Sequence, residues 1–434
     1  MAATNGMTEI TGLVKQVYPK GIVEAYSFAA PLASRLIKFD YQEAGLGDKY
    51  NQPVDIQLEH SFTAAAAGST PTYLAIKVGA MQNATAEGAQ LFGRSSVTYE
   101  ALSRAKSAGP KAFESAAKRV TKRLSMSHLK RLEMQLICGR RGIAVGSAIS
   151  GTSTTRALVV SAESWSAARF SGAVGATLAM LRADRSTAVA PVAGAAGSFY
   201  LSSVDVATRT LNITAHATDA TDMDTYWIAS TGGVLFFESN GTITEFGVTT
   251  EIAGLDAWCN LSGTWFNIAS GTYDLWNPNV YSTSTGVISF GKIVEAAEMV
   301  APYGSVKKLV ALCSVKAFSV LNTDIASLRQ YDSSYSTSKG EMGVEGIQFR
   351  CSVGVIEILP HPMQSDGIIH IFAPDEALRT GSSDIQFITR GSNGDNIVLE
   401  SATTPAGEMR TMSNQQLFIE QPRHLVLMSG ITFG

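Results

Sequence analysis

The chain has 434 residues, of which 45% are apolar and only 16% charged, against about 25% charged residues in a typical soluble domain. It contains no run of the roughly 18 to 20 apolar residues that a membrane span requires, and its first residues lack the pattern of a secretion signal. Four cysteines (Cys138, Cys259, Cys313 and Cys351) form no CxxC pair, so we expect reduced, structural thiols, a protein made in a cytoplasm and no membrane partner.

The charge is unevenly distributed along the chain. The net charge is −3, yet residues 94–141 hold twelve Lys and Arg against three Glu, a local charge of +9 that leaves −12 for the rest. A subunit with this separation can present its positive part to a polyanion. The low overall charge also favours a surface that is largely buried against copies of the same chain.

Residues 1–50 show no clear period and indicate an extended arm with a short helix around residues 29–37. Residues 51–108 predict a long ribbon of two strands. Val54, Ile56 and Leu58 alternate with polar residues, a loop rich in Gly and Ala follows residues 73–78, and a return strand is expected near residues 95–99. Such a ribbon has few large apolar groups, so a neighbour must support it.

Residues 110–138 predict the strongest helix, with Pro110 in its first turn and Gly139 as its stop. An apolar stripe lies on one side of this helix. The other side carries six basic residues: Lys118, Arg119, Lys122, Arg123, Lys130 and Arg131. They form either a solvated face or a candidate polyanion contact; the near absence of acidic partners at i+4 favours the second, as sequence-independent, salt-dependent binding of phosphate.

Residues 152–249 are rich in Thr, Val, Ala and Gly and predict an inserted β-rich module. Asn240-Gly241 predicts a hairpin turn that joins a strand at 235–237 to one at Ile243. The spacing of Asp219, Asp222 and Asp224 fits a polar turn better than a calcium loop.

From residue 250 onward, helices and strands alternate. Helices are expected at 291–300, 315–321 and 324–329. Strands are expected at 308–313, on both sides of Gly354 within 349–359, and at 368–372, 416–419 and 424–428. No period of 20 to 50 residues repeats, which argues against a solenoid or propeller.

The sequence lacks the common catalytic motifs: GxSxG, HExxH, GxxxxGK[ST], and GxGxxG after a strand. Its six histidines are scattered, and His361 lies between two prolines, which suggests a rigid turn. Cys138 has Arg140 and Arg141 nearby but no identifiable His or Asn partner. We therefore expect no enzyme, and no catalytic residue, metal or cofactor.

The order of these segments resembles the major capsid protein of tailed bacteriophages with the Hong Kong 97-like fold. Four stretches and the closing strand at 422–430 carry the resemblance: VTYE (97–100), IAGLDA (252–257), LRQYDSSY (328–335) and VIEILPH (355–361). The resemblance implies an α+β chain of seven parts. They are an N-terminal arm (1–50), an E-loop hairpin (51–108), a P-domain with a long spine helix (109–151), an inserted β-rich domain (152–249), a P-domain continuation (250–290), an A-domain (291–400) and C-terminal P-domain strands (401–434).

By this resemblance, copies would assemble into hexamers and pentamers of an icosahedral head around double-stranded DNA, in a virion assembled in the host cytoplasm. Scaffolding and portal proteins, and a decoration protein, would be partners, and the basic helix would touch DNA on the inner face without base specificity. Two alternatives are a shell protein of an encapsulin-type cellular compartment and a cytoplasmic hydrolase with an inserted β domain. Nothing in the sequence identifies cross-link partners or a cleaved pro-segment, so neither is expected.

Overall fold

The structure is a computed structural model of the chain. It describes residues 30–41, 49–98, 116–151, 155–182, 188–189, 199–214, 233–237, 243–244, 247–248, 251–260, 263–304, 306–328, 347–389, 399–400 and 406–433. These residues form two compact units. The smaller draws on 93–127 and 387–410, and the larger on 30–92, 128–386 and 411–434. Each unit is described by itself.

A six-stranded mixed sheet forms the centre of one half of the larger unit. Its strands, in spatial order, are β16 (Asn279–Ser282), β24 (Val426–Ser429), β20 (Ile369–Phe372), β17 (Lys308–Cys313), β19 (Gly354–Pro360) and β18 (Ile347–Cys351). β17 lies parallel to β19 and antiparallel to β20. After Lys308 its residues are all buried, as its unbroken apolar run predicts for a strand covered on both faces.

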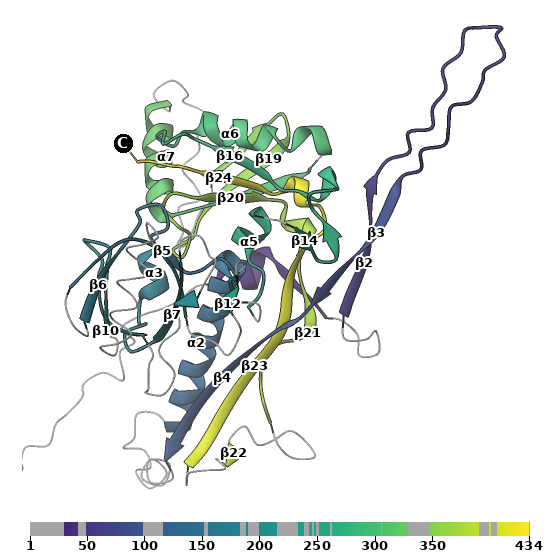
Figure 1. The fold of residues 1–434 in the computed structure, drawn as a ribbon. Coiled ribbons are helices and arrows are strands. Elements are labelled where there is room, and N and C mark those ends of the chain that lie inside the picture. The colour runs from purple at the N-terminus through teal and green to yellow at the C-terminus, as the bar shows by residue number, and fades with distance from the viewer. Residues whose placement is uncertain are drawn as a thin grey trace, which may run out of the picture. The chain divides into compact units, whose positions relative to one another are not determined.

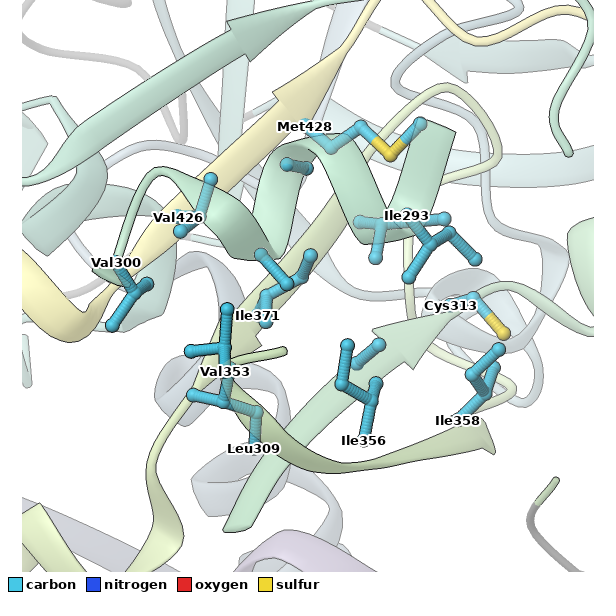
Figure 2. Close-up of a cluster of buried hydrophobic side chains, with 14 of the residues drawn as sticks. Ile293, Val300, Leu309, Cys313, Val353, Ile356, Ile358, Ile371, Val426 and Met428 are labelled. Atoms are coloured by element: carbon cyan, nitrogen blue, oxygen red, sulfur yellow. The ribbon is translucent and has the colours of Figure 1, made fainter. Parts of the chain in front are cut away.

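Two helices accompany this sheet: α6 (Phe290–Glu298) and α7 (Val315–Leu328). α6 begins after Ser289, whose hydroxyl accepts the Lys292 N–H at 3.4 Å as an N-cap. Ile293 of α6 and Met428 of β24 belong to one buried apolar cluster with Ile358 of β19 (Figure 2). Burial of each such side chain stabilises the fold by about 1.5–3 kcal/mol. The helices and strands expected here are confirmed, except that 315–321 and 324–329 belong to one helix, α7, and that β16 was not predicted.

The inserted module is a closed barrel of six antiparallel strands. They are, around the ring, β5 (Ala144–Ser150), β6 (Thr155–Val160), β10 (Thr210–Thr214), β9 (Phe199–Asp205), β7 (Thr177–Arg182) and β11 (Gly233–Phe237), with β8 (Ala188–Val189) beside β7. The ring closes because β11 pairs with both β5 and β7. β6 and β10 alternate buried and more exposed residues, as a half-buried strand should. Closure leaves these six strands without a free edge.

The prediction that the strand at 235–237 forms a hairpin with a strand at Ile243 is wrong. Both edges of β11 are taken by barrel strands, and β12 (Ile243–Thr244) pairs instead with β13 (Gly247–Val248). A turn signal describes only local backbone preference, whereas the long-range barrel pairings decided the partner of this strand. Asn240 and Gly241, like Asp219, Asp222 and Asp224, lie outside the described residues.

The expected ribbon is present, but its second strand was misplaced. β2 (Lys49–Gln57) pairs antiparallel with β3 (Ala80–Glu87), and β4 (Ala89–Thr98) begins after Gly88 (Figure 1). The Gly- and Ala-rich stretch is therefore strand, not loop. Ala84 and Ala86 are buried in β3, where a small side chain fits close to the neighbouring backbone. A Cβ atom on Gly88 would lie 2.0 Å from Asn414 Oδ1, so any other residue at this junction would require the Asn414 side chain to move.

The helix α2 (Ala116–Cys138) confirms the long basic helix, with Pro110 outside the described residues. It ends where the sequence indicated, although for a different reason. Arg140, not Gly139, adopts the left-handed conformation (φ 63°). Gly139 is required because an added Cβ would lie 2.2 Å from the Ile252 carbonyl oxygen. A single π-helical turn, η1 (Leu32–Leu36), stands where the short helix of the arm was expected.

Two long strands, β21 (Ala377–Phe387) and β23 (Ala406–Ile419), pair with each other, and each also pairs with a short strand. β1 (Lys38–Tyr41) pairs parallel with β21, and β22 (Leu399–Glu400) pairs antiparallel with β23. The length of β21 and of β23 was not predicted.

Candidate functional surfaces

The coil between β2 and β3, residues 58–79, carries a strip of exposed apolar side chains. Figure 1 shows it continuing beyond the two strands. Phe62, Tyr73 and Ile76 are highly exposed, at 80%, 83% and 80%. Four more exposed apolar residues lie beside them: Leu58, Leu74, Val78 and Met81. We call these seven residues the ribbon strip. So many exposed large apolar side chains within one short segment indicate a contact surface.

Few hydrogen bonds cross this coil. The His60 N–H donates to the Lys77 carbonyl at 3.1 Å, and the Leu74 N–H donates to Thr63 Oγ1 at 3.0 Å. A two-stranded extension with so little of its own packing is marginally stable in water. Its form therefore suits a segment that gains support from another molecule.

The root of the ribbon rests on a cluster of aromatic rings. Trp258 is fully buried and donates its indole N–H to the Leu417 carbonyl at 3.1 Å. Phe418 packs against Trp258 and also meets Tyr50 of β2 edge to face at 5.5 Å. The ribbon is thereby tied to a rigid base, although its coil is exposed.

A buried carboxylate and a buried guanidinium hold the two ends of η1. Glu133 of α2 is fully buried and accepts the N–H groups of Leu32 and Ala33, each at 2.8 Å. Arg379 of β21 donates to the carbonyls of Ala33 at 2.7 Å and Ile37 at 3.1 Å. The negative group meets the N-terminal end of the turn and the positive group its C-terminal end, as the peptide dipoles favour.

His361 completes the Glu133 site. The Met363 N–H donates to His361 Nδ1 at 3.1 Å, so Nδ1 carries no hydrogen and Nε2 does. Nε2 then donates to Glu133 Oε1 at 2.9 Å. The expectation of a rigid turn rather than a catalytic base fits this buried, fully bonded ring. Sequence reasoning counted Glu133 only as a charge; a lone acid among the apolar residues of a helix was the available signal.

The basic residues of α2 fall into two groups. In the smaller unit, Lys118, Arg119, Lys122 and Arg123 occupy positions i, i+1, i+4 and i+5, which share one helix face. The opposite face packs: Val120 and Leu124 lie against Val97 and Met409. Lys122 and Arg123 are exposed.

The other two basic residues have partners inside the larger unit. Arg131 pairs with Glu251 at 3.4 Å and covers the ring of Phe237 at 4.5 Å, and burial lowers its pKa. Lys130 donates to the Ser171 carbonyl, and burial lowers its pKa as well. Lys130 and Arg131 are half-buried whereas Lys122 and Arg123 are exposed, so the first group holds the better candidates for a polyanion contact.

Two buried cysteines and two buried histidines are also placed as structural residues. Burial raises the pKa of Cys138 to about 11 and that of Cys313 to about 12, which keeps both thiols protonated. His370 bonds Asp256 at 3.2 Å, and His424 bonds Glu376 at 2.8 Å.

Within the described ranges, no three or more His, Cys, Asp and Glu side chains gather where a metal ion could bind. Over the same part of the chain, no helix is long and apolar enough to cross a membrane.

No protein-family description and no curated protein sequence matches this chain. Solved structures do match it over nearly its whole length. The capsid subunit of cyanophage A-1(L) is 10% identical, with a TM-score of 0.58 over 97% of this chain and 98% of that one. The capsid subunit of a native GTA particle is 8% identical, with a TM-score of 0.50 over 99% and 100%. An encapsulin from Synechococcus elongatus aligns at a TM-score of only 0.40, too low to support an argument. With its mixed sheet, ribbon, long helix and inserted barrel, the chain has the α+β Hong Kong 97-like capsid fold.

Proposed function

We propose that this chain is the major capsid protein of a tailed bacteriophage. It assembles into hexamers and pentamers of an icosahedral head that encloses double-stranded DNA. The observation that carries the proposal is the full-length similarity in fold to a cyanophage capsid subunit, at nearly equal coverage of both chains. The seven-part division of the chain given above belongs to the same proposal, as does its location in a virion assembled in the host cytoplasm.

The ribbon strip supplies the physical reason for assembly. Phe62, Tyr73 and Ile76 are exposed in the isolated chain, and burying them against a second copy removes apolar surface from water. A standard interface buries about 800 Å² on each partner, which an extended ribbon of this length can supply. Scaffolding and portal proteins, and a decoration protein, are the further partners of this proposal.

Negative-stain microscopy of the purified chain, with and without a scaffolding protein, tests the proposal directly. We expect shells, sheets or capsomers. A chain that stays strictly monomeric under all conditions would contradict the proposed function.

A pair of matched variants tests the role of the ribbon strip. Phe62→Ser with Ile76→Ser should abolish assembly and leave the unfolding midpoint unchanged, because neither side chain is buried in the subunit. The control is Val174→Ser with Val206→Ser, two exposed valines of the barrel module, which should assemble normally. Equal assembly by both double variants would remove the ribbon strip from the interface.

We further propose that Lys118, Arg119, Lys122 and Arg123 contact packaged DNA from the inner face of the shell. Their face of α2 lies opposite the packed face, and Lys122 and Arg123 are exposed. Such contact depends on counterion release, and each neutralised phosphate contributes about −0.9 to the slope of log affinity against log salt.

The salt slope provides the test. Lys122→Gln with Arg123→Gln should weaken binding of duplex DNA by assembled shells or soluble chain and reduce the slope by about 2. The control removes the same charge from exposed residues of the six-stranded sheet region, as Lys307→Gln with Arg350→Gln. Equal slopes for the two double variants would contradict a specific role for α2.

A further inference from the structure

A short hairpin beside the ribbon has an unusual turn. β14 (Thr264–Trp265) and β15 (Ile268–Ala269) are joined by Phe266 and Asn267, whose φ angles are 49° and 69°. Two left-handed residues between paired strands define the type I′ turn, for which Asn-Gly is the preferred pair. A bulky residue such as Phe266 is disfavoured in this conformation and persists only where its surroundings hold it.

The ring of Phe266 is held by the aromatic cluster. It stacks on Trp258 with ring centroids 4.7 Å apart and an angle of 10° between the planes. Trp265 and Phe418 meet it edge to face at 5.5 Å and 6.0 Å. Since Trp258 is itself fully buried, the turn is anchored to the interior of the larger unit.

The same turn forms hydrogen bonds with β3 of the ribbon (Figure 1, β14 beside β3). The Thr85 N–H of β3 donates to the Phe266 carbonyl at 2.9 Å, and Asn267 Nδ2 donates to the Asn83 carbonyl at 3.4 Å. Asn83 lies opposite Pro53, which has no N–H to offer, so the polar groups at 83 and 85 face away from β2. The turn therefore covers the outer edge of β3 at the point where the ribbon leaves its base.

We propose that Phe266 and Asn267 are positioning residues that set the direction of the ribbon and so bring the ribbon strip onto a second copy of the chain. This inference rests on the proposed function. An extended chain rises about 3.3 Å per residue, so Ile76 lies up to about 30 Å from Thr85. A tilt of about 10° at the root would then move Ile76 by about 5 Å, more than a close-packed interface tolerates.

Substitutions at the hydrogen bonds between the turn and β3 test the proposal. Thr85→Pro deletes the N–H that donates to the Phe266 carbonyl and costs no main-chain hydrogen bond between β2 and β3, but it also removes the Thr85 hydroxyl. Thr85→Val keeps that N–H and loses only the hydroxyl that donates to Asn51 Oδ1 at 2.8 Å. We expect Thr85→Pro to reduce the yield of shells about tenfold at equal protein concentration, and Thr85→Val to assemble like the original chain.

A second variant separates positioning from stability. Phe266→Asn with Asn267→Gly creates the preferred type I′ pair, so the hairpin itself loses strain. A turn with a merely structural role would then leave both the unfolding midpoint and assembly unchanged or improved. Positioning through the Trp258 stack predicts a retained midpoint, faster hydrogen exchange of the β3 amides and fewer shells.

The outcomes distinguish the two proposals. Failure of the original chain to assemble overturns the proposed function. Assembly of the original chain together with undiminished assembly of Thr85→Pro, or of the double variant, overturns the positioning role. If Thr85→Pro fails to fold, the double variant decides alone.

Discussion

Replacing Glu133 by Gln should loosen the arm from its base. The carboxylate accepts three N–H groups, from Leu32, Ala33 and His361, in a fully buried position. An amide of the same shape offers only one acceptor oxygen and brings an NH2 group that donates. If its oxygen serves Leu32 and His361, the NH2 faces the Ala33 N–H, and two donors meet.

The structure gives the magnitude of the effect. Glu133→Gln loses one charge-assisted hydrogen bond, about 1.5–3 kcal/mol, and leaves a buried N–H without an acceptor, about 1–3 kcal/mol. The sum is about 2.5–6 kcal/mol, a range that includes the cost of about 3–5 kcal/mol for breaking other buried charged pairs. Rotation of the His361 ring does not rescue the site, because its Nδ1 already accepts the Met363 N–H.

Urea unfolding followed by tryptophan fluorescence measures this loss. The slope grows with chain size, so for 434 residues it should be at least about 3 kcal/mol per molar urea, and the midpoint should fall by about 1 M. Glu298→Gln makes the same chemical change at an exposed residue of α6 and should move the midpoint by less than about 0.3 M. A Glu133→Gln midpoint equal to that control would refute the reasoning, since it would mean that the carboxylate does not hold η1.

Three further predictions follow from burial. Burial lowers the pKa of His128 from 6.5 to about 4, so on acidification the unfolded chain takes up a proton before the folded chain does. The free energy of unfolding should therefore fall as pH drops from about 6.5 towards 4, by at most about 1.4 kcal/mol per pH unit. In unfolding titrations at several pH values, His128→Gln should flatten that slope. Cys138 and Cys313 should not react with a thiol reagent at pH 8 until the protein is unfolded, because their pKa values are raised to about 11 and about 12; fast labelling of either would contradict their burial. Ile358→Ala should destabilise by about 2–5 kcal/mol in urea titrations, because it empties part of the core in Figure 2; a loss under about 1 kcal/mol would show a site that collapses freely.

The hydrophobic period of the sequence correctly predicted those helices and strands that are covered in the same way along their whole length. β17 matches its apolar run because both of its faces are covered, and α6 matches its helical period because one face packs on the sheet. Prediction failed where the environment changes along the chain. Ala84 and Ala86 looked like loop residues, yet they are buried strand residues, since only a close neighbour makes a small side chain favourable.

The candidate surfaces divide in the same way. The basic face of α2 could be read from spacing, because i and i+4 residues share a face in any helix. The apolar residues of the ribbon strip could be read as well, but not their exposure, since exposure depends on what the rest of the chain leaves uncovered. The hydrogen bonds between Glu133 and η1 could not be predicted from the sequence. Glu133 and Leu32 are about 100 residues apart, and the carboxylate binds main-chain N–H groups, which leave no pattern in the sequence.

The sequence by itself determined the order of segments, the charge of the long helix and the α+β class, because these depend on composition and on periods of a few residues. Tertiary structure alone decided that the β-rich module closes into a barrel, that Arg131 and Lys130 turn inward, and that a strained turn grips β3. Each of these depends on contacts between residues distant in sequence. Such contacts form only once the chain has paid the entropy of loop closure, and no local preference encodes them.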